Sequence, residues 1–393
     1  SYMLHIRPFQ MKDLIKFGML AVVLLAACKR DNSTQTSSED VYLADYEVPE
    51  DKWGFMDTIG NLVIEAKYDD VGPFSEGLAA VNLNGKWGYV DHSGAMVIQP
   101  IFRSAWAFHE GFARVTPFDQ PALFIDKSGK PMLSEGWTAE DDFSNGRARV
   151  RVGTLFGYID HTGKMVIQSI YTRGWNFQSG LCVVEYQDKL GVINQDGKDI
   201  IAAVFDKIKL SANHQYILTL KGNDGFVLDG NGTEIIHLPN AKLVDTDGET
   251  VSVREGNNMY LLNMKDHSKS NPYINIIFLE DNRWAGRSAE GYQLMDSKGL
   301  LVSSNSYQQI NKFFEGIAAY SKGELWGYMN VDGAELTENV FGLAWDYKES
   351  LARAVFDEGI AFINKSQRIA FYPPQGSLDM RDFSEGLASV QVD

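Results

Sequence analysis

The segment Lys86–Val115, which reads KWGYVDHSGAMVIQPIFRSAWAFHEGFARV, decides the fold of this chain. It begins with aromatic and β-branched residues, which favour a strand, and continues into Asp-His-Ser-Gly, which is typical of a short hairpin turn. Met96–Ile98 forms the expected return strand, and Pro100 ends it because proline has no amide hydrogen to donate to a β-ladder. After an irregular stretch, Gly111 turns the chain into a third strand over Phe112–Val115. The segment therefore predicts three short antiparallel strands and no helix.

The same unit recurs along the chain, and Gly54 and Gly88, like Gly157 and Gly191, lie 34 residues apart. The Trp-Gly-Tyr signature lies at Trp53, Trp87, Phe156, Leu190 and Trp326, with weaker copies at 123–126, 224–226, 291–292 and 362–364. A second signature, Phe-Ser-Glu-Gly-Leu-Ala, begins at Phe74, Phe108, Phe143, Phe177, Phe313, Tyr347 and Phe383. Two independent signatures in constant phase indicate about ten tandem repeats. They are clear over 52–197 and 311–393 and eroded over about 198–310.

These residues resemble the bacterial WG-repeat family, also called the WG or KWG β-repeat, and Lys86–Val115 follows its unit most faithfully. The resemblance covers about residues 44–393. It implies a β-repeat domain over that range. It supplies no catalytic residues, because the family has no general ones.

Each unit has one apolar face, which neighbouring units must cover. Ten such antiparallel β-meanders suit an all-β, propeller-like or toroidal array, and the alternative is an open β-superhelix, which accepts any number of repeats. Ala44–Val48 can supply the strand that precedes Trp53, which would leave the first unit independent of the last. The last unit stops at Asp393, before the next expected Trp-Gly, and this fits either a truncated reading frame or a closing strand. We expect the propeller-like array.

The N-terminal region is interpreted as a targeting segment. Residues 1–10 precede Met11, the first plausible initiator, and are taken as an upstream artefact. Residues 11–27 combine basic residues with an apolar run that is well short of the ~20 residues needed to span a bilayer. The run ends in Leu-Ala-Ala-Cys28, which resembles the bacterial lipoprotein box and implies a cleaved signal peptide and an acylated Cys28. An ordinary signal peptide with an incidental cysteine and a truncated membrane anchor are the alternatives.

Residues 28–43 are expected to form a flexible tether, because they are polar and rich in serine and threonine. Lys29 does not resemble the aspartate that retains lipoproteins at the inner membrane, so we expect a lipid-anchored protein of the bacterial cell envelope, at the outer membrane. Whether the repeat domain faces the periplasm or the outside stays open. The formal net charge of −16 repels phosphate backbones and argues against a nucleic-acid partner.

The acidic residues of the repeat are better explained by turns than by chemistry. Asp91 and Asp160 occupy turns whose amides an aspartate can cap, and 194–197 and 330–333 open like calcium loops but lack the later carboxylates that such loops need. The glutamate before glycine recurs once per unit, so we expect it to serve the turn in which it lies. The glutamates in question are Glu76, Glu110, Glu315 and Glu385. The sequence therefore predicts no catalytic residue, no metal site and no cofactor.

The candidate ligand-binding residues are Trp106, Trp175 and Trp345, each two residues before the aromatic residue of the second signature. Residues i and i+2 of a strand share a face, so packing in the core is the first interpretation. The alternative is an exposed ladder that stacks on sugars or peptide side chains. Cys182 takes the place of Ala79 in a sister unit and is expected to be a buried filler.

The resulting prediction is a non-catalytic binding or scaffold module, anchored in the envelope, for an unknown protein or glycan partner. Extended repeat arrays offer broad surfaces for this purpose. The alternatives are a glycan-active enzyme on a propeller-like fold and a purely structural spacer.

Overall fold

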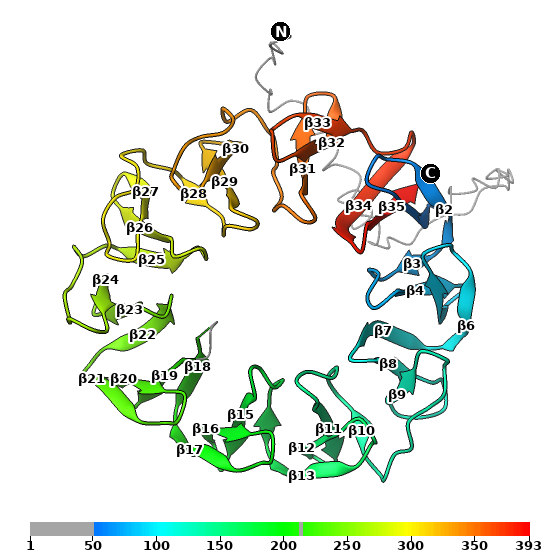
Figure 1. Ribbon diagram of the computed structural model, residues 1–393, viewed down its shortest axis with the longest axis horizontal. Coiled ribbons are helices and arrows are strands. Elements are labelled where there is room, and N and C mark those ends of the chain that lie inside the picture. The colour runs from blue at the N-terminus through cyan, green and yellow to red at the C-terminus, as the bar shows by residue number, and fades with distance from the viewer. Residues whose placement is uncertain (1–50, 212–214) are drawn as a thin grey trace, which may run out of the picture.

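The computed structural model describes residues 51–211 and 215–393. These residues form ten antiparallel sheets arranged in a ring, as Figure 1 shows. They contain strands and turns and no helix. Within the same ranges, no helical segment has the length and hydropathy needed to span a bilayer. The prediction of an all-β, propeller-like array of about ten repeats is confirmed.

Five sheets have four strands. In hydrogen-bonding order they are β2 (Leu62–Tyr68), β1 (Lys52–Met56), β35 (Leu387–Val392) and β34 (Ser377–Ser384); β3 (Asp70–Val71), β4 (Leu78–Leu83), β5 (Lys86–Asp91) and β6 (Met96–Phe102); β10 (Thr138–Ala139), β11 (Ala148–Val152), β12 (Leu155–Ile159) and β13 (Met165–Tyr171); β14 (Arg173–Gly174), β15 (Leu181–Tyr186), β16 (Lys189–Asn194) and β17 (Asp199–Phe205); and β18 (Lys207–Leu210), β19 (Tyr216–Lys221), β20 (Asp224–Asp229) and β21 (Glu234–Leu238).

The other five sheets have three strands. They are β7 (Ser104–His109), β8 (Phe112–Thr116) and β9 (Leu123–Asp126); β22 (Lys242–Thr246), β23 (Thr250–Glu255) and β24 (Asn258–Asn263); β25 (Asn275–Phe278), β26 (Trp284–Ser288) and β27 (Gly291–Met295); β28 (Gln309–Ile310), β29 (Ile317–Lys322) and β30 (Leu325–Asn330); and β31 (Leu351–Phe356), β32 (Gly359–Asn364) and β33 (Ile369–Phe371). In each of these sheets isolated β-bridges take the place of the missing strand, which is the last one where Ile125 pairs with Pro131 and the first one where Ala344 pairs with Ala354.

The structure adds one strand to the three that the sequence predicts for each repeat. The stretch expected to be irregular forms the first strand of the sheet, such as β3 or β7, and this strand lies nearest the centre of the ring in Figure 1. Its side chains show no clear alternation, because their partners lie partly in the next repeat. The first strands therefore line the inner side of the ring and carry the residues described below.

The ring is closed by strands from the two ends of the described chain. β1 pairs with β35 over five residue pairs, from Lys52 with Val392 to Met56 with Ala388. This pairing favours the closed array over the open superhelix. The expectation that the first unit is independent of the last is therefore wrong, because β35 completes the sheet of β1; Ala44–Val48 lies outside the described residues.

The hydrophobic core lies between neighbouring sheets. On β4, Ala79 and Val81 pack with Phe55 of the preceding sheet, whereas Ala80 packs with Phe108 of the following one. All three β4 residues are buried, since the strand is covered on both faces. No sheet could bury its apolar residues alone, and neighbouring repeats supply the cover.

The glycine of the Trp-Gly signature lies at a β-bulge. The register of β5 with β6 shifts between Trp87 and Tyr89. A Cβ atom on Gly88 would come within 2.4 Å of the Ile98 carbonyl oxygen and 2.7 Å of the Pro100 nitrogen. Only glycine lets the two backbones approach this closely.

Candidate binding site on the inner strands

The turn between the first and second strands, with the sequence Glu-Gly in several repeats, joins neighbouring repeats. Glu76 has a φ of 54° and Gly77 a φ of 87°, the left-handed conformations required of both residues in a two-residue primed turn. The Glu76 carboxylate accepts a hydrogen bond of 2.9 Å from the amide of Gly111, in the equivalent turn of the next sheet. We call this bond the inter-sheet latch. The expectation that the glutamate serves its own turn is therefore wrong.

The latch recurs around the ring and also closes it. Glu76, Glu110, Asn145, Glu315, Glu349 and Glu385 accept from the amides of Gly111, Gly146, Gly180, Ser350, Gly386 and Gly77, respectively. Three serines of the same signature add a second hydrogen bond to the repeat that follows. Ser75, Ser144 and Ser384 donate to the carbonyl groups of Phe108, Phe177 and Phe74. The carboxylates that recur in the sequence are thus used to hold neighbouring sheets together.

Basic side chains from the following sheet lie beside several latch carboxylates. His161 Nε2 lies 2.8 Å from Glu110 Oε2, and Lys365 Nζ lies 3.0 Å from Glu315 Oε2. Partial burial of Glu315 opposes ionisation, but the hydrogen bonds from Lys365 and from the Ser350 amide lower its pKa overall. These pairs are partly exposed, so each stabilises the fold only weakly.

The aspartates at the second turn cap it as the sequence predicts. Asp91 Oδ1 accepts from the Ser93 hydroxyl at 2.6 Å and from the amides of Ser93 and Ala95. The hydrogen bond from the Ser93 side chain is the main cause of the lowered pKa of Asp91. Among the described residues, no group of three or more histidine, cysteine, aspartate or glutamate side chains is placed to hold a metal ion.

Three arginines connect the inner strands, and the sequence analysis did not identify them. Arg114, Arg149 and Arg353 follow the alanine of the second signature, and each donates to the carbonyl three residues before the signature aromatic of the next repeat. Arg114 Nη1 lies 2.8 Å from the Glu140 carbonyl oxygen. The signal in the sequence is the repeated Ala-Arg pair, whose partner could not be identified without the three-dimensional arrangement.

Two of the three candidate tryptophans lie under these arginines. The guanidinium carbon of Arg114 lies 4.0 Å from the centroid of the Trp106 ring, and that of Arg353 lies 4.7 Å from Trp345. Both tryptophans are half-buried. The three candidates lie in three different sheets of the ring, so the structure does not bring them together as one ladder.

Trp175 differs because it is 40% exposed. Val183 occupies the position that Arg114 and Arg353 hold in their repeats, so no arginine of the second strand lies over this ring. Arg173, itself on the inner strand β14, lies 5.1 Å from the ring centroid. The position that carries an arginine in the repeats of Trp106 and Trp345 is thus a valine in the repeat of the exposed Trp175.

A pocket of about 480 Å³ lies beside Trp175, between the sheet of β10–β13 and the sheet of β14–β17. It is lined by Asp141, Arg149, Phe156, Arg173, Gly174, Trp175, Asn176 and Gln178. Arg149 pairs with Asp141 at 2.6 Å, and its guanidinium carbon lies 4.8 Å from the Phe156 ring centroid. Burial raises the pKa of Asp141, although Arg149 and Arg114 act in the opposite direction. The Nε atom of Arg149 is buried without a hydrogen-bond partner.

The backbone under this pocket is held by a buried polar cluster. The carbonyl of Trp175 accepts from the Tyr158 hydroxyl at 2.9 Å and from the Cys182 thiol at 3.0 Å. Burial raises the pKa of Cys182 to about 11 and that of Tyr158 above its ordinary value. Cys182 is completely buried, which confirms its expected role as a small core residue.

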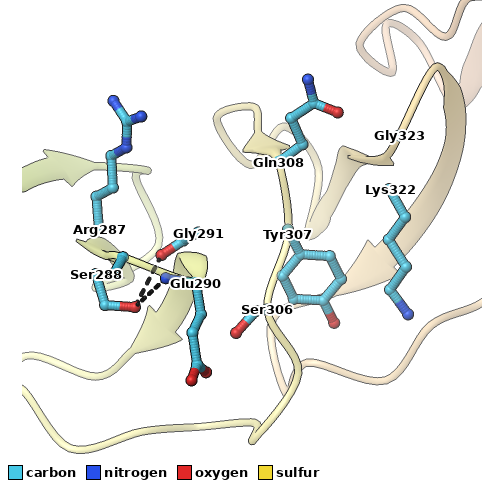
Figure 2. A pocket seen from close by; sticks show the side chains of 10 residues that line it. Arg287, Ser288, Glu290, Gly291, Ser306, Tyr307, Gln308, Lys322 and Gly323 are labelled. Carbon is cyan, nitrogen blue, oxygen red and sulfur yellow. Dashed lines mark hydrogen bonds between the residues drawn. The ribbon is translucent and has the colours of Figure 1, made fainter.

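A second pocket of about 370 Å³ lies between the β26–β27 turn and the segment before β28, as Figure 2 shows. Ser288, Glu290, Ser306 and Lys322 contribute polar groups to it. Lys322 is already paired with Glu335 at 2.6 Å, and the Tyr307 side chain is buried. This pocket therefore offers polar groups but no exposed aromatic face, and the Trp175 pocket is the stronger candidate.

Comparison with known proteins gives one family match. The family model "WG containing repeat" matches residues 53–87, 87–116 and 156–189. No curated protein matches the chain.

Several solved structures resemble the chain distantly. The computationally designed Ika8 protein is 12% identical, with a TM-score of 0.35, and the match covers 74% of this chain and 94% of that one. BamB from Moraxella catarrhalis is 9% identical, with a TM-score of 0.35 and coverage of 82% and 96%. A eukaryotic initiation factor is 7% identical, with a TM-score of 0.46 and coverage of 66% and 84%. The family match falls on the repeats with the clearest signatures, so residues 53–116 and 156–189 of this chain are WG-containing repeats.

Proposed function

We propose that this protein is a non-catalytic binding module, anchored in the bacterial cell envelope through an acylated Cys28. The observation that carries the proposal is a difference in exposure among three tryptophans that occupy the same position in their repeats. An arginine of the second strand lies on Trp106 and on Trp345, whereas Trp175 has the largely exposed Arg173 over its ring and is itself 40% exposed beside a pocket. Tryptophan is enriched among the residues that contribute most to binding at interfaces.

The use of the repeated carboxylates supports a non-catalytic role. Glycan-active enzymes generally need two carboxyl groups on opposite sides of a bond. The Glu-Gly carboxylates are engaged in inter-sheet latches, and among the residues that line the Trp175 pocket only Asp141 carries a carboxylate. Its pairing with Arg149 gives it a structural task.

A pure spacer is the second alternative, and the Trp175 pocket argues against it. A spacer would gain from covering Trp175 with arginine, as other repeats do. With Val183 at that position, Trp175 stays 40% exposed, and the arginine over its ring is Arg173 of the inner strand.

The anchor belongs to residues outside the described ranges and rests on the Leu-Ala-Ala-Cys28 segment. We expect metabolic labelling with palmitate to modify the full-length chain in a bacterial host and to fail in Cys28→Ser. Labelling that persists in this variant would contradict the lipoprotein proposal.

The binding role is tested by capturing envelope proteins and glycans with the immobilised full-length chain. We expect at least one component to be retained by the wild type and lost with Trp175→Ala, while Tyr372→Ala, which removes another exposed aromatic side chain, retains it. A component captured equally by all three proteins would not support the proposal. Hydrolysis of a captured glycan by the wild type would show catalysis and contradict it.

A further inference from the structure

The repeat that carries Trp175 lacks the second-strand arginine that lies on the equivalent tryptophan in two sister repeats. In sister repeats the arginine after the signature alanine lies on the tryptophan ring, at 4.0 Å for Arg114 and 4.7 Å for Arg353. At this position the chain has Val183, which is too short and too apolar to take that place. The Trp175 ring is instead approached by Arg173 of the inner strand, at 5.1 Å from its centroid, and it stays 40% exposed to an external group.

The charges around Trp175 are balanced within the protein. Arg149 pairs with Asp141 at 2.6 Å, and Arg173 lies 3.3 Å from Glu185. A ligand therefore need not bring a charge to neutralise the pocket. With both arginines paired, the pocket has no unpaired carboxylate among these groups to attract a cationic group, and the net charge of −16 disfavours a nucleic acid.

The remaining polar groups suit a ligand that carries several hydroxyls. Asn176 is exposed, and the pocket also includes the guanidinium of Arg173, whose side chain is 63% exposed. The volume of about 480 Å³ lies within the range of about 300–1,000 Å³ typical of small-molecule sites. A pyranose ring combines an apolar C–H face, which packs on an aromatic ring, with a rim of hydroxyls that both donate and accept hydrogen bonds.

We infer that the Trp175 pocket binds a neutral pyranose residue of a glycan, with one sugar face on Trp175 and its hydroxyls directed to Asn176 and Arg173. This inference rests on the proposed binding function and specifies its ligand class.

The test is isothermal titration calorimetry of the full-length chain with defined probes. The neutral probes are maltohexaose, cellohexaose and chitohexaose; the acidic probe is hexagalacturonate, and the basic probe is hexalysine. We expect at least one neutral hexasaccharide to bind. Trp175→Ala should weaken this binding at least tenfold, because it removes the stacking surface.

Val183→Arg is the sharper variant, because it gives this repeat the residue found in its sisters. We expect the new arginine to cover Trp175 and to weaken sugar binding at least tenfold while the tryptophan remains in place. Val183→Leu and Tyr372→Ala are the matched controls and should bind as the wild type does. The thermal midpoint of each variant establishes that it is folded.

The outcomes separate this inference from the proposed function. If hexagalacturonate, hexalysine or a captured envelope protein binds in a Trp175-dependent manner and the neutral sugars do not, the sugar inference is wrong and the binding role stands. Sugar binding that is unchanged in both Trp175→Ala and Val183→Arg would place the site elsewhere and overturn the inference. If no neutral probe binds and no envelope component is captured, both proposals fail.

Discussion

Gly88 shows how a single residue type is fixed by the backbone around it. The bulge between β5 and β6 places the Ile98 carbonyl where a side chain would begin. The same close approach occurs at Gly54, Gly157 and Gly191, with 2.4–2.6 Å between the would-be Cβ and a carbonyl oxygen. The glycine of the signature is therefore explained by sterics within one sheet.

We expect Gly88→Ala to destabilise the protein by about 2–4 kcal/mol, because the backbone of β6 must move to admit the methyl group. Gly72→Ala is the control. Its Cβ would lie 3.6 Å from the Ala80 Cβ, which is ordinary contact, so its effect should stay within about 0.5 kcal/mol. Urea denaturation of both variants measures the difference, and equal stability would contradict this account of the glycine.

Cys182 should be unreactive in the folded protein. Its thiol is buried and its pKa is raised to about 11, so almost no thiolate forms at pH 8. We expect DTNB to leave Cys182 of the Cys28→Ser variant unmodified in buffer and to modify it fully in 6 M guanidinium chloride. Rapid modification in buffer would show that the buried Tyr158–Cys182 cluster is accessible.

At the scale of the element, the strands and turns could be predicted from one repeat, but the bonds between repeats could not. The alternation in Lys86–Val115 gives β5, β6 and β8, and the Asp91 turn follows from its residue types. The inner strand β7 was missed because its pattern is mixed and much of its environment belongs to the next sheet. The latch joins residues about 35 positions apart, a distance in sequence that indicates no contact by itself.

The candidate site was only partly predictable for the same reason. The sequence identified Trp106, Trp175 and Trp345 as equivalent, but it did not distinguish them. What distinguishes Trp175 is Val183, on the adjacent strand, and this matters only once Arg114 and Arg353 are seen to lie on the other rings.

The latch at Glu315 should make stability depend on pH. Its pKa is lowered from 4.5 in the folded state, so its contribution is fully present above the unfolded value and is lost as the pH falls through the folded value. Glu315→Gln keeps an acceptor for the Ser350 amide but removes the charge opposite Lys365. We expect this variant to lose less than about 1 kcal/mol at pH 7 and to match the wild type near pH 3. A constant difference at both pH values would show that the charge has no role.

At the scale of the whole molecule, stability depends on ten similar interfaces, one of which joins sequence-distant strands. The sheet that closes the ring, formed by β2, β1, β35 and β34, makes the same kinds of hydrogen bond to its neighbour as the other sheets do. Glu385 accepts from Gly77, Ser384 donates to the Phe74 carbonyl, and Arg381 donates to the Val71 carbonyl. In the described region, every repeat therefore has a neighbouring repeat on both sides.

This arrangement makes a specific circular permutation possible. Val392 lies opposite Lys52 on the ladder, as Leu83 lies opposite Lys86 across the Asn84-Gly85 turn. Asp393 followed by one added glycine and then Lys52 would recreate such a hairpin. We expect the permutant that begins at Asn223 and ends at Gly222, both exposed turn residues, to fold with a melting temperature within about 5 °C of the unpermuted chain from residue 52 onward. A permutant that remains unfolded would contradict the closure of the ring.

The inter-sheet latches all run the same way, with each glutamate accepting from the repeat that follows. Contacts between unlike surfaces of identical units can continue from one molecule into another, and they then build filaments. Here β1 pairs with β35 of its own chain, because this strand is present at a far higher effective concentration than the β35 strand of any other molecule. Partial unfolding at the closing sheet, in crowded or concentrated conditions, would expose both halves of this joint and direct the protein towards head-to-tail, strand-exchanged polymers.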